Sequence, residues 1–253
     1  MDARSSLAYD PRMPTFKREE LELNYEVHGA GYPVLLFAPG GMRSSIAFWQ
    51  KTPYDPIREL SPHFRVIAMD QRNAGASRGP VAASDGWHTY AADQLALLNE
   101  LGVERCHLLG NCIGGAFALE LIRVAPERVS AAVLQQPIGD SGTNRQLFHT
   151  MFDGWAEELV KSRPEIAAPA LAGLKANLYG GSFTFSVTGE DVMRCRQPLL
   201  VLRGDDQYHP AAVSEEIARI APRAELIEKW KTGDDVTSAV SRVVAFLKEN
   251  TPR

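Results

Sequence analysis

A regular alternation of short apolar runs with longer segments of helical period constrains the fold of this chain more than any other feature. Runs bounded by Gly and Pro predict strands at residues 21–27, 34–38, 66–69, 106–109, 131–135, 199–202 and 224–230. Segments with apolar residues three and four apart predict helices at residues 55–60, 91–101, 113–124, 211–220 and 236–248. Strands joined by helices in this way are typical of a mostly parallel sheet with flanking helices. We therefore predict an α/β fold.

The alternation breaks once, between residues 138 and 193. Two helical segments, 144–162 and 164–178, follow each other there without a strand, and a Gly-rich stretch follows at 179–182. We predict that residues 138–193 form a small helical cap, and that residues 1–137 and 194–253 form the core. One face of the first cap helix is apolar, and we expect it to pack the cap onto the core rather than to line a substrate site: Leu147, Phe148, Met151, Phe152, Trp155 and Leu159.

Charge and composition narrow the classes of partner. The 253 residues carry 27 basic and 31 acidic side chains, a formal charge of −4, and no basic run stands out. We therefore expect no binding to nucleic acid or to an anionic membrane. The first twenty residues contain no apolar leader and no stretch is long enough to cross a bilayer, so a cytoplasmic location is expected. Three cysteines are too few for a disulfide framework.

The most chemically informative segment joins the strand at 106–109 to the helix at 113–124. It contains Gly110-Asn-Cys112-Ile-Gly114, the shape of a G-x-S-x-G nucleophile elbow with cysteine in place of serine. The strained turn needs small residues two before and two after the nucleophile, and both positions are glycine. The amides and dipole of the helix N-terminus lower the pKa of a thiol placed there. Cys112 is therefore the candidate nucleophile, whereas Cys106 and Cys195 fit a structural role.

The chain resembles the α/β-hydrolase superfamily over nearly its whole length. The segment from Asp70 to Ser77, DQRNAGAS, is similar to the D-x-R-G-x-G-x-S turn of that family, with Asn73 replacing a glycine. The segment APGG, ending at Gly41, lies where the family carries its H-G-x turn. The resemblance implies that the backbone amides of Gly41 and Ile113 form an oxyanion hole.

The chain departs from the family pattern at the general base. The resemblance implies an acid after the strand at 199–202, where Asp206 is the best candidate and Asp205 its rival. It also implies a histidine after the last strand, but no histidine follows His209. His209 itself lies three residues after Asp206, and we consider it either the base for Cys112 or an exposed residue ahead of a helix. Whether Asp206 bonds His209 is left open by the sequence.

The other histidines are weaker candidates. His88 is a reserve base, because aromatic residues flank it, and His107 is expected to be a core imidazole within its strand. No His or Cys spacing indicates a metal site, and no Gly-rich motif indicates a nucleotide. We therefore expect no cofactor.

Two functions remain open from the sequence. The first is an enzyme that attacks an ester, thioester or lactone carbonyl of a small-molecule acyl substrate through Cys112, with His209 as base. The second is a scaffold that has lost hydrolysis and serves as a small-molecule binder, lyase or isomerase. The missing terminal histidine favours the second, and the intact elbow favours the first.

Overall fold

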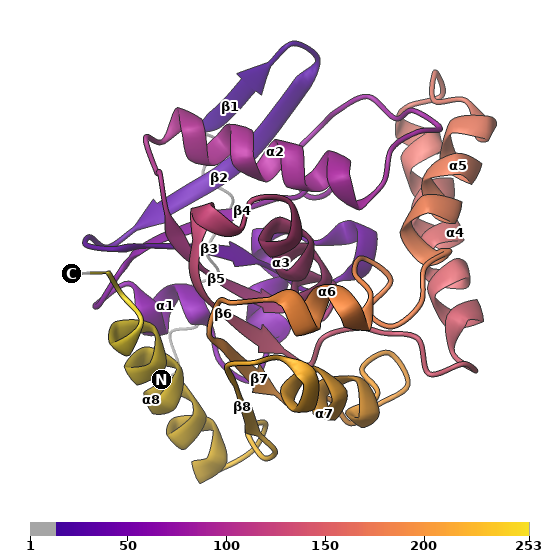
Figure 1. Cartoon of the computed structure of the whole chain (residues 1–253). Coiled ribbons are helices and arrows are strands. Elements are labelled where there is room, and N and C mark those ends of the chain that lie inside the picture. Colours follow the sequence, from indigo (N-terminus) through magenta and orange to yellow (C-terminus); the bar gives the residue numbers. More distant parts are fainter. Residues whose placement is uncertain (1–13, 253) are drawn as a thin grey trace, which may run out of the picture.

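A computed structural model describes residues 14–252 of the chain. An eight-stranded sheet forms its centre, in the order β1-β2-β4-β3-β5-β6-β7-β8 (Figure 1). The first two strands pair antiparallel to their neighbours, and the others are parallel. The strands are β1 (Thr15–Arg18), β2 (Leu21–His28), β3 (Pro33–Phe37), β4 (Arg65–Met69), β5 (Cys106–Asn111), β6 (Val129–Gln135), β7 (Leu199–Leu202) and β8 (Ala224–Ile227).

Helices cover both faces of the sheet (Figure 1). Their bounds are α1 (Pro56–Leu60), α2 (Trp87–Glu100), α3 (Ile113–Val124), α4 (Arg145–Ser162), α5 (Ala168–Tyr179), α6 (Gly189–Arg194), α7 (Ala211–Ile220) and α8 (Asp234–Glu249). Short 3-10 helices lie at η1 (Gly41–Arg43), η2 (Ile46–Lys51) and η3 (Pro126–Arg128). One hydrophobic core lies between the sheet and α2, α3 and α7, and the other between the sheet and α1 and α8.

The central strands are buried on both faces, which explains their continuous apolar sequence. Within β3, Leu35 and Phe37 enter the core beside α3, whereas Val34 and Leu36 enter the core beside α8. The register pairs Phe37 with Gly110. The carboxyl ends of β3, β5 and β6 therefore meet at one edge of the sheet, where the turns that follow them come together.

The predicted α/β architecture is confirmed, with differences at its edges. The helices expected at 113–124 and 211–220 have those bounds in the structure. Strand β1 was not predicted, because only Phe16 of its four residues is buried. The last strand ends at Ile227 rather than at residue 230, and the short helix α6 was not predicted.

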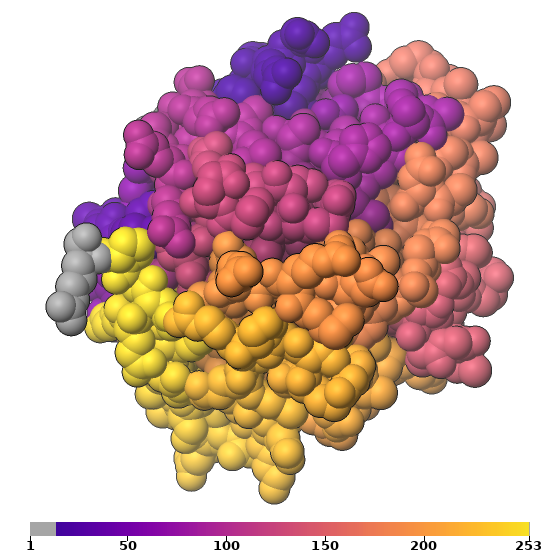
Figure 2. Space-filling model, viewed as in Figure 1, coloured from indigo at the N-terminus to yellow at the C-terminus, as the bar shows by residue number. Residues whose placement is uncertain are grey.

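The 138–193 insertion holds α4 and α5 beyond the carboxyl edge of the sheet, at the right of Figure 1. The same segment forms the salmon-coloured lobe at the right of Figure 2. Phe148, Phe152, Trp155 and Leu159 of α4 are buried, as expected of its apolar face, while Leu147 and Met151 are partly exposed.

Among residues 14–252, no helix has the length and apolar character needed to span a membrane. The expectation that no apolar leader is present concerned the first twenty residues. Of these, residues 1–13 lie outside the described part of the chain.

Candidate active site

Cys112 occupies the sharp turn that the sequence predicts between β5 and α3. Its backbone dihedrals, φ 60° and ψ −119°, lie in a region that non-glycine residues rarely adopt. The turn is held by hydrogen bonds from the Cys112 amide to the Gln135 carbonyl (3.0 Å) and from the Gly115 amide to the Cys112 carbonyl (3.1 Å). The half-buried thiol is therefore held at the carboxyl edge of the sheet by a strained backbone.

Two glycines make this turn sterically feasible. A Cβ atom at Gly110 would lie 2.1 Å from the carbonyl oxygen of Gly114. A Cβ atom at Gly114 would lie 2.1 Å from the carbonyl oxygen of Phe37 in β3. Backbone atoms cannot move aside as side chains can, so the small residues expected on both sides of Cys112 are a requirement of the packing.

Gly114→Ala is expected to lower the free energy of unfolding by about 3 kcal/mol or more, since the new methyl group meets fixed backbone. Gly154→Ala is the matched control. Gly154 lies within α4, and a Cβ atom there would come no nearer than 3.9 Å to its closest neighbour, so this change should be neutral or stabilising. Denaturant unfolding of both variants gives the comparison. Equal stability of the two variants would contradict the tight elbow.

His209 and Asp206 form a hydrogen-bonded pair within one loop. The Nδ1 atom of His209 lies 2.8 Å from Oδ2 of Asp206. The other carboxylate oxygen, Oδ1, accepts the backbone amides of Tyr208 (2.8 Å) and His209 (3.0 Å). The carboxylate thus fixes both the loop and the imidazole. This answers the question that the sequence left open, because Asp206 does bond His209.

The structure brings His209 and Cys112 together. The imidazole is buried, and its Nε2 atom makes no hydrogen bond to any residue in the range 14–252. The charge of the Cys112 side chain nevertheless acts on this ring, together with the charge of Asp206. His209 is therefore buried, and the other expectation for this position, an exposed residue ahead of a helix, is wrong about its exposure.

The two groups shift each other's pKa in opposite directions. Burial acts to raise the pKa of the Cys112 thiol, but the charge and hydrogen bond of His209 outweigh burial and lower the pKa overall. For His209, burial acts to lower the pKa, but the charge of Cys112 and the hydrogen bond and charge of Asp206 raise it to about 9. Each group therefore favours the charged form of the other, a thiolate beside an imidazolium.

Backbone amides approach the sulfur from two elements. The amides of Gly40 and Ile113 both act to lower the pKa of Cys112, as hydrogen bonds to a thiolate do. The sequence points to Gly41 rather than Gly40, and Gly41 follows directly at the start of η1. A Cβ atom at Gly41 would lie 2.6 Å from Sδ of Met151 in α4. The sequence does not distinguish the two adjacent glycines of the APGG turn, so it did not identify Gly40. The role of Gly41 as an oxyanion donor stays a prediction.

The loop after β8, where the resemblance implies a histidine, holds other side chains. Lys231 forms an ion pair with Asp205. The neighbouring Trp230 is buried and donates its indole N–H to the carbonyl oxygen of Arg203 at 2.9 Å. Asp205, the rival candidate acid, is thus engaged by Lys231, while Asp206 holds His209.

The remaining predicted histidines do not join this group. His88, the reserve base, is exposed in the first turn of α2. His107 is buried in β5, where its Nε2 atom lies 2.9 Å from Oγ1 of Thr251 and burial lowers its pKa to about 4. Across the described part of the chain, no three His, Cys, Asp or Glu side chains converge as metal ligands would.

The turn from Asp70 to Ser77 joins the core to the insertion. Asn73 adopts φ 59°, a conformation that asparagine tolerates where the family has glycine. Its Oδ1 atom accepts a hydrogen bond from Arg163 (3.1 Å), and its backbone carbonyl accepts one from the indole of Trp155 (3.2 Å). The asparagine side chain, which stands where the family has glycine, therefore provides a contact to Arg163, the residue that follows α4, and the sequence does not indicate this contact.

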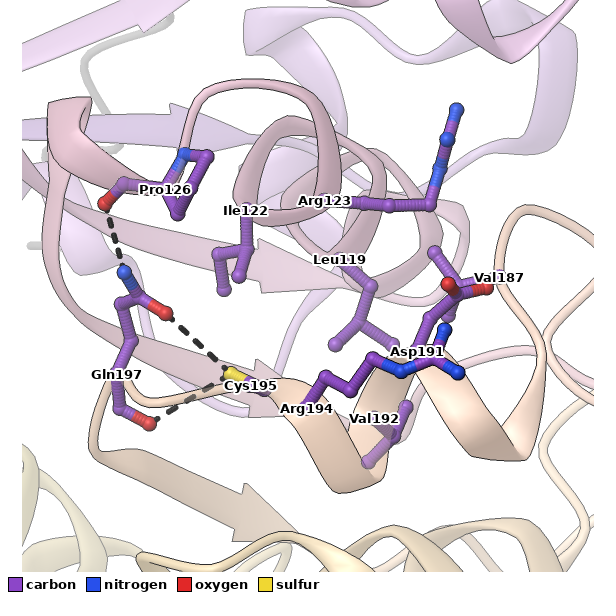
Figure 3. A pocket seen from close by; sticks show the side chains of 10 residues that line it. All are labelled: Leu119, Ile122, Arg123, Pro126, Val187, Asp191, Val192, Arg194, Cys195 and Gln197. Carbon is purple, nitrogen blue, oxygen red and sulfur yellow. Dashed lines mark hydrogen bonds between the residues drawn. The ribbon is translucent and has the colours of Figure 1, made fainter.

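A pocket of about 220 Å³ lies away from this site, between α3 and α6 (Figure 3). Its polar side chains are already paired with protein groups. Arg123 bonds Glu120, Arg194 bonds Glu190, and the Cys195 thiol lies 3.6 Å from Oε1 of Gln197. Leu119, the lining residue nearest to Cys112 along α3, is seven positions away, or about 10 Å along a helix. This pocket is separate from the Cys112 site.

The chain belongs to the α/β-hydrolase fold family, which matches residues 33–167, more than half of its length. Fold and family together define it as an α/β-hydrolase-fold protein. The chain is similar to RutD of Azorhizobium caulinodans, a protein that is named as a carbamate hydrolase. The two are 35% identical over 125 residues, which cover 48% of this chain and 43% of that protein. RutD of Yersinia enterocolitica is 31% identical over 157 residues, 54% of its length. The chain thus matches about half of the length of these relatives.

Solved structures agree with this fold over nearly the whole chain. The enol-lactonase of Burkholderia xenovorans LB400 superposes with a TM-score of 0.68 at 19% identity, covering 93% of this chain and all of the other. A meta-cleavage product hydrolase from Pseudomonas fluorescens IP01 gives 0.67 at 22% identity, covering 91% of this chain and 96% of the other. At this level of identity the likeness establishes the fold.

Proposed function

We propose that the chain is a hydrolase that attacks a small-molecule acyl carbonyl through Cys112, with His209 as general acid and base and Asp206 as the residue that orients it. The observation that carries the proposal is the pairing of a strained elbow thiol with an imidazole whose other nitrogen is fixed by a carboxylate 2.8 Å away. This is the nucleophile, base and orienting group of a catalytic triad, with the last two on one loop.

The first half-reaction transfers the acyl group to sulfur. The thiolate of Cys112 attacks the carbonyl carbon, a C–S bond forms, and the carbonyl electron pair moves onto oxygen. The amides of Ile113 and of the Gly40–Gly41 turn donate to this oxyanion. When the tetrahedral intermediate collapses, the imidazolium of His209 gives its Nε2 proton to the leaving oxygen, sulfur or nitrogen.

The second half-reaction releases the acid. The now neutral His209 takes a proton from a water molecule, and the resulting hydroxide attacks the thioester carbon. The C–S bond breaks, the Cys112 thiolate is regenerated, and the imidazolium is restored. Asp206 accepts the hydrogen bond from Nδ1–H throughout, which keeps Nε2 as the nitrogen that exchanges protons.

Esters, thioesters and lactones are the substrates that this chemistry favours, because their leaving groups need least assistance. The names of the relatives add carbamates and enol-lactones to the panel to be tested. A non-hydrolytic scaffold, in which the pocket binds, cleaves or isomerises a small molecule, remains the second candidate. It is supported by Lys231 and Trp230 in the loop that carries the family's histidine.

Mapping of acyl adducts tests the proposal. The protein is incubated with p-nitrophenyl esters, aryl thioesters, an enol-lactone and an aryl carbamate, and digested peptides are analysed by mass spectrometry. We expect one acyl mass, on the peptide that contains Cys112. Cys106 and Cys195 are internal controls, because burial raises the pKa of both thiols. Adducts on those cysteines, or no adduct and no turnover with any substrate, would favour the non-hydrolytic alternative.

A further inference from the structure

The hydroxyl of Tyr179, at the end of α5, is buried without a hydrogen-bond partner among residues 14–252. Burying an unpaired hydroxyl destabilises a protein, because the group loses its hydrogen bonds to water. Such a group calls for an explanation, since buried polar atoms are nearly always paired. One explanation is that its partner is supplied by a bound ligand.

The ring of Tyr179 is held in place by its neighbours. It stacks on Phe148 with ring centroids 5.6 Å apart, and Phe185 and Phe152 contact it edge-on at 5.5 and 6.3 Å. The backbone carbonyl of Tyr179 accepts a hydrogen bond from Arg145. With both ring and backbone fixed, the hydroxyl cannot turn away to find a partner elsewhere.

Two chains of contacts connect this ring to the Cys112 site. Phe148, on which Tyr179 stacks, also contacts the ring of Tyr208 at 5.7 Å, and Tyr208 is adjacent to His209. Phe152, which also contacts Tyr179, follows Met151, whose side chain packs against Gly41. Tyr179 therefore lies on the insertion one aromatic ring away from Tyr208, the neighbour of His209 in the sequence.

The charge of Cys112 reaches Tyr179 as well. Burial, then Tyr90, then Cys112 raise the pKa of the Tyr179 phenol above its ordinary value. The phenol therefore stays protonated at neutral pH and is available as a hydrogen-bond donor.

We propose that the Tyr179 hydroxyl is a specificity-determining donor that binds an acceptor oxygen of the substrate beyond the scissile carbonyl. The scissile oxygen is left to the backbone amides of Ile113 and the Gly40–Gly41 turn, on the sheet side of the site, whereas Tyr179 approaches from the insertion. The enzyme would thus select alkoxy-, hydroxy- or oxo-substituted acyl groups over plain alkyl ones. This inference rests on the proposed function of Cys112.

Matched substrates with and without the extra oxygen test the selection. We compare kcat/KM for p-nitrophenyl methoxyacetate with that for the butanoate, and for the 3-methoxypropanoate with that for the pentanoate, which have equal chain lengths. In Tyr179→Phe, the preference for the oxygen-containing member of at least one pair should fall about tenfold, the effect of losing one hydrogen bond to a buried partner. Tyr32→Phe is the control, because the Tyr32 hydroxyl already bonds Oγ of Ser130 at 2.5 Å; its preferences should equal those of the wild type.

Thermal unfolding gives a second readout that needs no turnover. Removing an unpaired buried hydroxyl should raise the unfolding midpoint of Tyr179→Phe, by about 2–4 °C. Tyr32→Phe loses a hydrogen bond and should unfold at a lower temperature. A lowered midpoint in Tyr179→Phe, or preferences unchanged by it, would overturn the inference. If the wild type forms no adduct at all, the proposed function fails, and the unfolding comparison still decides whether the hydroxyl is unpaired.

Discussion

Cys112→Ala is expected to abolish acyl-adduct formation and ester turnover completely. The substitution removes the atom that forms the covalent bond and leaves the fold in place, because alanine is smaller than cysteine and tolerates the same turn no worse. Intact-protein mass and p-nitrophenol release measure the loss. Cys195→Ala is the control, since that thiol faces Gln197 in a separate pocket and should leave acylation unchanged. Retention of a Cys112-independent adduct would remove the thiol from the mechanism.

The same variant should change the titration of His209. The charge of Cys112 is the main cause that raises this pKa to about 9, so the pKa should fall in Cys112→Ala, as followed by NMR of the imidazole protons. The extra proton that the folded wild type holds on His209 is offset by the proton that the Cys112 thiol gives up, because each group favours the charged form of the other. Stability changes with pH only through a net difference in bound protons, so the pair adds little alkaline dependence of stability in the wild type. An unchanged His209 pKa in Cys112→Ala would contradict the pairing.

His209→Ala is expected to slow acylation of Cys112 by about two to four powers of ten, the usual contribution of a positioned acid or base. Two effects combine in this loss: the leaving group loses its proton donor, and the thiol loses the charge that lowers its pKa. Stopped-flow release of p-nitrophenol measures the first turnover. Alkylation by iodoacetamide as a function of pH should show thiolate reactivity shifted to higher pH than in the wild type.

Asp205→Asn provides the control for this prediction. Asp205 lies in the same loop but pairs with Lys231 rather than with His209, so its loss should change acylation little. An acylation rate in His209→Ala equal to that of the wild type would exclude His209 as acid or base. The elbow thiol would then act with its backbone amides alone.

The sequence predicts the central sheet better than its edges, for physical reasons. Strands buried on both faces, such as β5 and β6, leave continuous apolar runs that are visible without the structure. Strand β1 has only Phe16 to bury, and its pairing with β2 is a tertiary contact that leaves no periodic signal. The apolar side chain of Trp230 leads the sequence to predict a strand up to residue 230. In the structure β8 ends at Ile227, and the Trp230 indole is buried beyond the strand, where it donates a hydrogen bond to the carbonyl of Arg203.

Part of the candidate site could likewise be predicted from the sequence, and part of it could not. The elbow could be predicted because its constraints are local: a glycine two positions away on either side and a strand followed by a helix. The approach of His209 to Cys112 depends on how the turns after β5 and β7 meet at the sheet edge. The hydrogen bond between Asp206 and His209 depends on an Asx-type turn whose geometry the two intervening residues do not specify. Tyr179 gave no signal, because an unpaired hydroxyl is a property of packing.

Placing the acid and the imidazole on one short loop has a consequence for how the site tolerates change. Where these groups come from two loops, any relative drift of those loops separates them. Here Asp206 and His209 are joined by a few bonds and by hydrogen bonds to the intervening amides, so they move as one unit. Under this proposal, β8 and α8 do not have to position a catalytic side chain. Substitutions in them are then limited only by how well the new side chains pack.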